Sequence, residues 1–406
     1  SEGEAMRKHI NRILTLALLL AIAVIFIGTM VQYGRNYAYG FFVSYKDLMP
    51  RNATVFDDIS ARIAKLSENV SSRLFLRNPI RQLNAAFQLA TGKKIISIAG
   101  NDMVKLKCGA YYGLFTGDFT TDKMEELASF AEKLKAEKGI STVFSYCHSG
   151  LYEDGQLPAG MEDWDNNIEC ADTLLADFRA RGVVVSDSRD AYRASGLTMD
   201  EAINKSDVHW SHKMALAAAR ETARTMNEEL GLSLDEEKLN VENFDEIVYE
   251  RLLMGEYGRR IGFKNVTPDD VHELWPKYDT HMLYEELNDD VRREGTFREA
   301  VINEENLERD PDTGYSEKAY YIYSTYLAQT HIHNEDGEPL TVLVFKDSYG
   351  TPLGAFLSLT VRDTYAVDLR STRLTMEECV AKVNPDVVIF AYSQQTLREF
   401  SYDIAE

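Results

Sequence analysis

The alternation of apolar and polar positions separates an N-terminal apolar stretch from a larger region of mixed character. Residues 13–31 are almost continuously apolar, and a helix of that length matches a hydrocarbon core of roughly 30 Å. We therefore predict a transmembrane helix at residues 13–31. Residues 33–92 mix apolar and charged positions with the period of amphipathic helices, which predicts a helical stalk and entry region.

Further along the chain, short β-branched runs alternate with amphipathic stretches. The pattern predicts strands at residues 94–100, 140–146, 183–187, 341–345, 365–368 and 386–390, and helices at residues 121–138, 168–181, 213–230, 352–361 and 375–383. Strands and helices in alternation favour right-handed crossovers, and near-continuous apolar strands suit a sheet that is covered on both faces. The expected fold class is therefore α/β, with a parallel sheet flanked by helices.

Residues 232–340 interrupt this alternation because they are acidic and polar. We interpret them as an insertion or cap between the first part of the domain, residues 93–231, and its second part, residues 341–406. Within the insertion, the glycines of residues 255–262 predict a turn-rich loop. The tyrosine-rich stretch 320–330 could form an antiparallel strand pair.

Charge narrows the choice of partners and of compartment. The 406 residues are 45% hydrophobic, enough for a substantial core, and the formal charge of −21 argues against nucleic acid as a partner. Arg7, Lys8 and Arg12 precede the apolar stretch and only Arg35 closely follows it, so the positive-inside rule places residues 1–12 in the cytoplasm. We expect a single-pass protein of the cell membrane with an extracytoplasmic body. A cleaved signal peptide is the alternative, although its apolar region would usually be shorter.

The sequence predicts neither a metal site nor a cofactor. The four cysteines have no C-x-x-C spacing, which removes the usual zinc and redox interpretations. His212 and the pair Cys147-His148 lack a third ligand at a spacing that would suit a metal.

Two short motifs carry the candidate chemistry. Asp207 and His209 stand in the sequence D-V-H-W ahead of a predicted helix, with Ser211 as a plausible N-cap. Ser348 stands in K-D-S-Y-G directly after an apolar strand, where ligands bind in α/β sheets. A serine becomes nucleophilic beside an imidazole that a carboxylate orients, so we predict Ser348 as nucleophile, His209 as base and Asp207 as the orienting acid. Taken singly, each motif could also be a strand-to-helix turn or a surface pair packed on Trp210.

The order of these motifs resembles that of the DHHW proteins, relatives of the SGNH-hydrolase-like alginate O-acetyltransferases. The likeness covers roughly residues 40–395 and includes residues 252–262, 276–280 and 366–370. It implies a permuted SGNH-like architecture in which the acid–base pair precedes the serine. There are two departures: Val208 stands where the family has a histidine, and Lys346 stands where a G-D-S block has a glycine.

The resemblance implies an extracytoplasmic Ser-His-Asp site for O-acyl transfer, most often of acetyl, to a cell-surface or exported polysaccharide. It also implies a multi-spanning membrane acyltransferase as a partner. Further candidates for oxyanion or substrate binding are the backbone N–H groups of Ser348 and Tyr349, and the side chains of Arg370, Gln394, Tyr257 and Arg260. Two alternatives stay open: a carbohydrate esterase with the same triad, and a non-catalytic polysaccharide-binding or scaffolding subunit.

Overall fold

The computed structural model describes most of the chain as two compact units, residues 1–87 and 88–406, which are treated separately. The described residues are 2–42, 54–56, 59–60, 62–63, 66, 74–98, 100–115, 117, 121–148, 150–153, 155–287, 290–324, 329–400 and 402–404. Much of the predicted stalk at residues 33–92 therefore lies outside the described residues.

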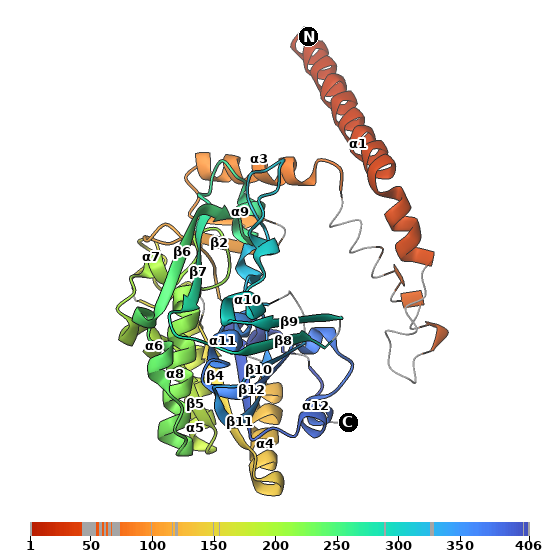
Figure 1. The fold of residues 1–406 in the computed structure, drawn as a ribbon. Helices are drawn as coiled ribbons and strands as arrows, with labels where there is room; N and C mark the ends of the chain where they lie inside the picture. The colour runs from red at the N-terminus through yellow and green to blue at the C-terminus, as the bar shows by residue number, and fades with distance from the viewer. Residues whose placement is uncertain are drawn as a thin grey trace. The chain divides into compact units, whose positions relative to one another are not determined.

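The first unit contains the predicted apolar helix. Helix α1 spans Glu2–Phe42, longer than the predicted residues 13–31, and is drawn in red in Figure 1. Its segment Met6–Ala38 is long and apolar enough to cross a membrane, and its most apolar part is almost entirely exposed. Length and composition of this kind suit a retained anchor and a signal sequence alike. The amphipathic helix α3, Arg77–Ala90, runs across the boundary between the two units.

The second unit is built on an eight-stranded sheet with the order β5-β4-β13-β11-β12-β10-β8-β9 (Figure 1). The strands are β4 Ser141–Cys147, β5 Val184–Asp187, β8 Met282–Glu286, β9 Val291–Gly295, β10 Thr330–Asn334, β11 Glu338–Lys346, β12 Val361–Val367 and β13 Val387–Ser393. The five strands from β5 to β12 run parallel, and β10, β8 and β9 continue the sheet antiparallel. The predicted α/β class with a mostly parallel sheet is confirmed.

Helices cover both faces of this sheet, as Figure 1 shows for α8 and α4. One face packs against α6 Ser188–Ser195, α8 His212–Leu230 and α11 Gly350–Leu357, and the other against α4 Thr121–Lys138, α5 Asn167–Ala180 and α12 Met376–Val383. Along β11, Val342 and Val344 enter one core while Leu343 and Phe345 enter the other. From Val342 to Phe345 the strand is apolar at every position because side chains on both of its faces are buried.

The first predicted strand lies elsewhere than expected. β1, Ile95–Ile98, forms a separate antiparallel sheet with β2, Asn101–Lys105, and β3, Tyr111–Gly113. β2 begins only three residues after β1 ends, whereas a parallel pair needs a crossover of a dozen residues or more. The short connection therefore excludes β1 from a parallel pairing with its successor.

Residues 232–340, predicted as an insertion or cap, contribute three strands to the main sheet. They also form the hairpin of β6, Phe244–Leu253, and β7, Asp269–Pro276. The glycine segment predicted as a loop is a short helix, α9 Glu256–Ile261. Of the stretch 320–330, expected to form a strand pair, residues 325–328 lie outside the described residues; its described part holds the end of a 3-10 turn, Ala319–Tyr321, and the first residue of β10. The remaining short elements are α7 Met199–Ala202, α10 Phe297–Val301, α13 Gln394–Arg398 and 3-10 turns at Glu236–Leu239, Val241–Asn243, Glu304–Leu307, Ala319–Tyr321 and Leu369–Ser371.

Candidate functional site

The candidate nucleophile lies at the carboxyl end of the central parallel strands. Ser348 follows β11, the strand between β12 and β13, and precedes α11. The segment after β12 carries Arg370, and Ser393 is the last residue of β13. Because the carboxyl ends of parallel strands meet at one edge of a sheet, these segments converge around Ser348.

Asp347 fixes the turn that holds Ser348. Its carboxylate is 2% exposed and accepts a hydrogen bond of 2.9 Å from the Tyr349 N–H. It also accepts bonds from the N–H and hydroxyl of Ser393, at 2.8 and 2.6 Å, and from the Thr396 hydroxyl at 2.8 Å. Four hydrogen bonds to Asp347 therefore hold the turn that contains Ser348. The acid of the K-D-S-Y-G motif has a structural role.

The loop that carries His209 is attached to this turn by Tyr349. Its ring lies 5.0 Å from that of His209 and 5.4 Å from that of the buried Trp210, and its hydroxyl donates to the carbonyl of Val208. Ser211 caps α8 as predicted, because its hydroxyl accepts from the Met214 N–H at 3.2 Å. The start of α8 and the tyrosine together determine where the imidazole lies.

The structure brings the three predicted residues together. The Ser348 hydroxyl lies 2.7 Å from Nε2 of His209, while Nδ1 of His209 donates to Oδ1 of Asp207. Oδ2 of Asp207 accepts from the Glu256 N–H at 2.8 Å. With Nδ1 protonated against the carboxylate, the Nε2 lone pair faces the serine hydroxyl and can accept its proton.

Asp207 is buried yet remains ionised. Burial by itself would raise its pKa, but the charge and hydrogen bond of His209 and the backbone N–H groups of Glu256 and His209 outweigh that effect. The pKa of Asp207 is therefore lowered. An ionised carboxylate here would stabilise an imidazolium at His209, should that ring accept a proton.

Sequence reasoning missed the aromatic residues around the imidazole. The ring of Tyr320 stacks on that of His209 with centroids 3.9 Å apart and planes 16° apart, and Tyr321 meets it edge-on at 6.0 Å. The tyrosine-rich composition of this segment was visible, but nothing local in it indicates a partner more than a hundred residues earlier.

Two supports of the D-V-H-W loop were also missed. Gly255 has an extended backbone, and a Cβ there would overlap the carboxylate of Asp207. Asp269 accepts from the N–H groups of Lys205 and Ser206, at 2.5 and 2.8 Å, and from the Ser206 hydroxyl at 2.5 Å. Burial raises the pKa of Asp269 to about 7, and the nearby charge of Asp207 adds to the rise. A carboxylate and a glycine from elements after α8 therefore shape the acid–base pair.

A cavity of about 340 Å³ opens beside Ser348 and His209. Arg370 lines it and is held by Asp368 through bonds of 2.8 Å from Nε and 2.6 Å from Nη2. The other lining residues are Val208, Glu256, Tyr321, Asp347, Tyr349, Ser393, Gln395, Thr396, Glu399 and Tyr402. Their charged, amide and aromatic groups are suited to a polar ligand.

The remaining candidates differ in their relation to this cavity. Gln394 is only 4% exposed, and its neighbour Gln395 lines the cavity instead. The hydroxyl of Tyr257 accepts from the Gly113 N–H at 2.9 Å, and Tyr257 is not among the lining residues. Arg260 forms an ion pair with Glu256, which does line the cavity.

The two candidate oxyanion donors also differ. The Tyr349 N–H is engaged by Asp347. Among the described residues, the Ser348 N–H has no hydrogen-bond acceptor. Of the two backbone groups, that of Ser348 is therefore the one that can bind a developing negative charge.

Lys346, the departure from a G-D-S block, is buried beneath the nucleophile turn. Its side chain is 1% exposed, and Nζ lies 3.8 Å from Oδ2 of Asp368 without a hydrogen-bond partner among the described residues. Burial lowers the pKa of Lys346, and the carboxylate of Asp368 opposes that effect. The same carboxylate binds Arg370, so Lys346 and the arginine that lines the cavity share one acid.

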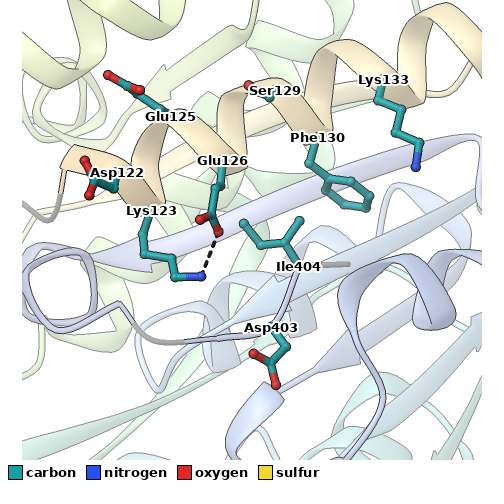
Figure 2. Close-up of a pocket in the computed structure, with 9 residues that line it drawn as sticks. All are labelled: Asp122, Lys123, Glu125, Glu126, Ser129, Phe130, Lys133, Asp403 and Ile404. Carbon is teal, nitrogen blue, oxygen red and sulfur yellow. Dashed lines mark hydrogen bonds and ion pairs between the residues drawn. The ribbon is translucent and has the colours of Figure 1, made fainter. Parts of the chain in front are cut away.

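A larger cavity, about 660 Å³, lies between α4 and the C-terminal segment (Figure 2). Its wall carries mostly charged groups, among them Lys123 and Glu126, whose ion pair Figure 2 draws as a dashed line. The ammonium of Lys123 lies 2.7 Å from the carboxylate of Glu126. Its single hydroxyl, on Ser129, accepts from Arg181 at 2.8 Å, and no histidine lines this cavity. It lacks a nucleophile with a base, so the smaller cavity is the candidate site.

Comparison with known proteins agrees with the fold. Residues 118–300 match a family model described as SGNH hydrolase-like domain, acetyltransferase AlgX. A DHHW family protein from Eubacterium siraeum is 18% identical over 75% of this chain and 94% of its own, with a TM-score of 0.56. PatB1 from Bacillus cereus is 15% identical over 75% of this chain and 97% of its own, with a TM-score of 0.58. The structure of PatB1 with a sulfonyl adduct is 14% identical over 75% of this chain and 100% of its own, also with a TM-score of 0.58. No curated protein sequence matches the chain. The predicted resemblance to the DHHW and SGNH-like proteins is confirmed.

Proposed function

The chain carries an SGNH hydrolase-like domain of the AlgX type, and from this premise we propose that it is a serine-dependent O-acyltransferase that acetylates a cell-surface or exported polysaccharide. The observation that carries the proposal is the contact of 2.7 Å between the Ser348 hydroxyl and Nε2 of His209, whose Nδ1 is bound to Asp207. Hydroxyl, imidazole and carboxylate in this order form an acyl-accepting nucleophile.

In the first half-reaction, Oγ of Ser348 attacks the carbonyl of the donor acyl group while Nε2 of His209 takes the hydroxyl proton. The Ser348 N–H binds the oxyanion, and the intermediate collapses to a serine ester as the imidazolium returns the proton to the leaving group. In the second half-reaction, His209 deprotonates a sugar hydroxyl, which attacks the serine ester. The new sugar ester leaves and Ser348 regains its proton, so the protein is unchanged overall.

The walls of the cavity support a carbohydrate acceptor. Tyr321 and Tyr402 offer aromatic faces, while Arg370 and Gln395 offer donors for sugar hydroxyls. The formal charge of −21 favours a neutral or cationic polymer over a polyanion. Retention of α1 as an anchor would keep the domain where a multi-spanning membrane acyltransferase delivers acyl groups.

A serine-reactive probe tests the proposal. Because PatB1 is known with a sulfonyl adduct, the full chain in detergent is treated with a sulfonyl fluoride and the modified residue is found by mass spectrometry. We expect one adduct, on Ser348, and none in Ser348→Ala. His209→Ala should slow labelling and acyl-enzyme formation by a factor on the order of 10⁶. Ser129→Ala, which changes a serine in the other cavity, should label normally.

The acceptor is then identified with an activated acetyl ester and a set of oligosaccharides. Acetylated sugar in excess of free acetate supports transfer, while acetate alone would assign a carbohydrate esterase. An intact chain that is never labelled and forms no acyl-enzyme would contradict catalysis and assign a binding or scaffolding role.

A further inference from the structure

A cluster of two histidines and an aspartate lies on the face of the main sheet, away from the candidate site. His331 and His333 are alternate residues of β10, so their side chains leave the same face. Asp363 is the partner of His333 on the adjacent strand β12. One ligand atom from each of the three residues lies within 4.8 Å of the other two.

Both imidazoles converge on a single oxygen. Oδ1 of Asp363 lies 2.9 Å from Nε2 of His331 and 2.9 Å from Nδ1 of His333. On the far side of His331, Nδ1 lies 3.2 Å from Oε2 of Glu285, which belongs to β8. The other oxygen of Glu285 accepts from Arg292 at 2.9 Å.

His331 lies between two carboxylates, those of Glu285 and Asp363. A neutral imidazole has one N–H and one lone pair, so between two carboxylates one of its nitrogens would present a lone pair to an anion. When Nδ1 donates to Glu285, the lone pair of Nε2 points at the oxygen of Asp363. A metal cation bound to both Nε2 and this oxygen removes the repulsion. The carboxylate of Glu285, behind the ring, is placed as are the carboxylates that orient metal-bound histidines.

We propose that Nε2 of His331, Nδ1 of His333 and Oδ1 of Asp363 bind a divalent transition-metal ion, with Zn²⁺ as the best match. Two imidazoles and one carboxylate form a typical zinc ligand set, and one position stays open for water. The His333 and Asp363 side chains are 33% and 24% exposed, so the ion can enter from solvent.

The ion would act as a clamp rather than in acyl transfer. Asp363 precedes Asp368, at the end of β12, by five residues, which places it roughly 16 Å from the candidate site along the strand. The ligands join β10, in the antiparallel part of the sheet, to β12, the last of the parallel strands. The sequence predicted no metal because the third ligand comes from a neighbouring strand 30 residues later.

Zinc binding is measured on the full chain in detergent, purified with a tag free of histidine and stripped with a chelator. We expect uptake of one Zn²⁺ per chain in competition with a chromophoric chelator. Co²⁺ in its place should give visible d–d absorption without a thiolate charge-transfer band. His333→Ala and Asp363→Asn should each weaken binding at least about tenfold, and Glu285→Gln by about 10- to 100-fold.

His281→Ala is the matched control. Its ring also lies 2.9 Å from a carboxylate, that of Asp336, but this pair is not among the three-ligand clusters of the described residues. This variant should bind Zn²⁺ as the unchanged chain does. Absence of stoichiometric uptake, equal uptake in all variants, or a thiolate band would overturn the proposal. If Asp363→Asn does not fold, His333→Ala decides, because it removes a partly exposed ring.

Discussion

Asp207 and Asp269 are two buried carboxylates that contact the same short loop, and their surroundings move their pKa values in opposite directions. Asp207 faces the imidazole of His209 and backbone donors, which lower its pKa. Asp269 accepts only neutral donors from Lys205 and Ser206, so burial prevails and raises its pKa to about 7. The loop thus contains an acid that stays ionised, Asp207, and is held by a second acid, Asp269 of β7, that is protonated in mildly acidic solution.

The raised pKa of Asp269 predicts a pH dependence of stability. Between 3.8, its ordinary pKa, and about 7, the carboxyl binds a proton in the folded chain but not in the unfolded chain. The contribution of Asp269 to the free energy of unfolding is therefore complete below about pH 4. It is lost as the pH rises to about 7, which lowers the free energy of unfolding by up to about 4 kcal/mol. In Asp269→Asn the melting temperature should lack this decline. Thermal melts of the full chain in detergent from pH 4 to 8 check this.

Asp270→Asn serves as the control for that series. Asp270 is exposed and adjacent, so this variant should keep the pH profile of the unchanged chain. Superimposable pH profiles for Asp269→Asn and the unchanged chain would refute the prediction.

At the residue scale, the sequence revealed only the residues that stand in local motifs. Ser348, His209 and Asp207 could be predicted because the chemistry of each motif is legible within a few positions. Tyr320, which stacks on the imidazole, and Asp269 belong to remote segments without such a motif. Their contribution depends on contacts that only the folded chain creates.

Helix α9 is the element that positions the acid of the candidate triad. Its first N–H groups reach the D-V-H-W loop: Gly255 donates to the Ser206 hydroxyl at 3.0 Å and Glu256 donates to Asp207. Gly258 donates to the carbonyl of Ser206 at 2.8 Å. The glycines of residues 255–262 predicted a loop. In the structure, Gly255 instead allows the start of α9 to lie against the carboxylate of Asp207.

The close approach at Gly255 predicts a strong effect of a single methyl group. Gly255→Ala would place Cβ on the carboxylate of Asp207, which must then shift and turn away from His209. We expect the rate of acyl-enzyme formation to fall by a factor on the order of 10² while the fold persists. Stopped-flow acylation and circular dichroism measure the two effects.

Gly354→Ala is a suitable comparison because a Cβ there meets only Ala366, at an ordinary 3.9 Å. It should acylate normally. Full activity of Gly255→Ala would show that the contact between α9 and Asp207 does not position the acid.

Element types were more predictable than element partners. The predicted helix at residues 121–138 coincides with α4, and the parallel strands β4, β11 and β13 occupy their predicted places within a few residues. The separate sheet of β1 and the addition of β8, β9 and β10 to the main sheet were missed. Apolar alternation specifies which faces are buried, whereas pairing depends on connection lengths and on partners far along the chain.

At the scale of the whole molecule, the chain is either anchored in a membrane by α1 or released when α1 is removed as a signal sequence. Its leucines are mostly exposed, for example Leu16 at 67% and Leu20 at 66%, which is unfavourable in water and favourable in lipid. We expect the helix to be retained, so that alkaline extraction leaves the chain in the membrane fraction with residues 13–31 present in its intact mass. A shortened, soluble product that lacks these residues would identify a signal sequence instead.

The topology of this anchor can be examined independently of its retention. Arg7, Lys8 and Arg12 predict that the body is reached by protease from outside the cell and not from the cytoplasm. Replacing these three residues with glutamate should invert part of the population, whereas the same replacement at Lys133, Lys135 and Lys138 should not. Protease protection in spheroplasts and in inverted vesicles distinguishes these orientations.

The strand order of the main sheet ends at β9 within the described residues, so the backbone of β9 is unpaired on its outer side. Such a rim is a template on which a foreign strand can add and begin aggregation. Strand β9 carries Arg292, Arg293 and Glu294. A strand that added to this edge would have to desolvate these charges or bring like charges next to them. The charges on this edge strand thereby disfavour polymerisation of the chain through its own sheet.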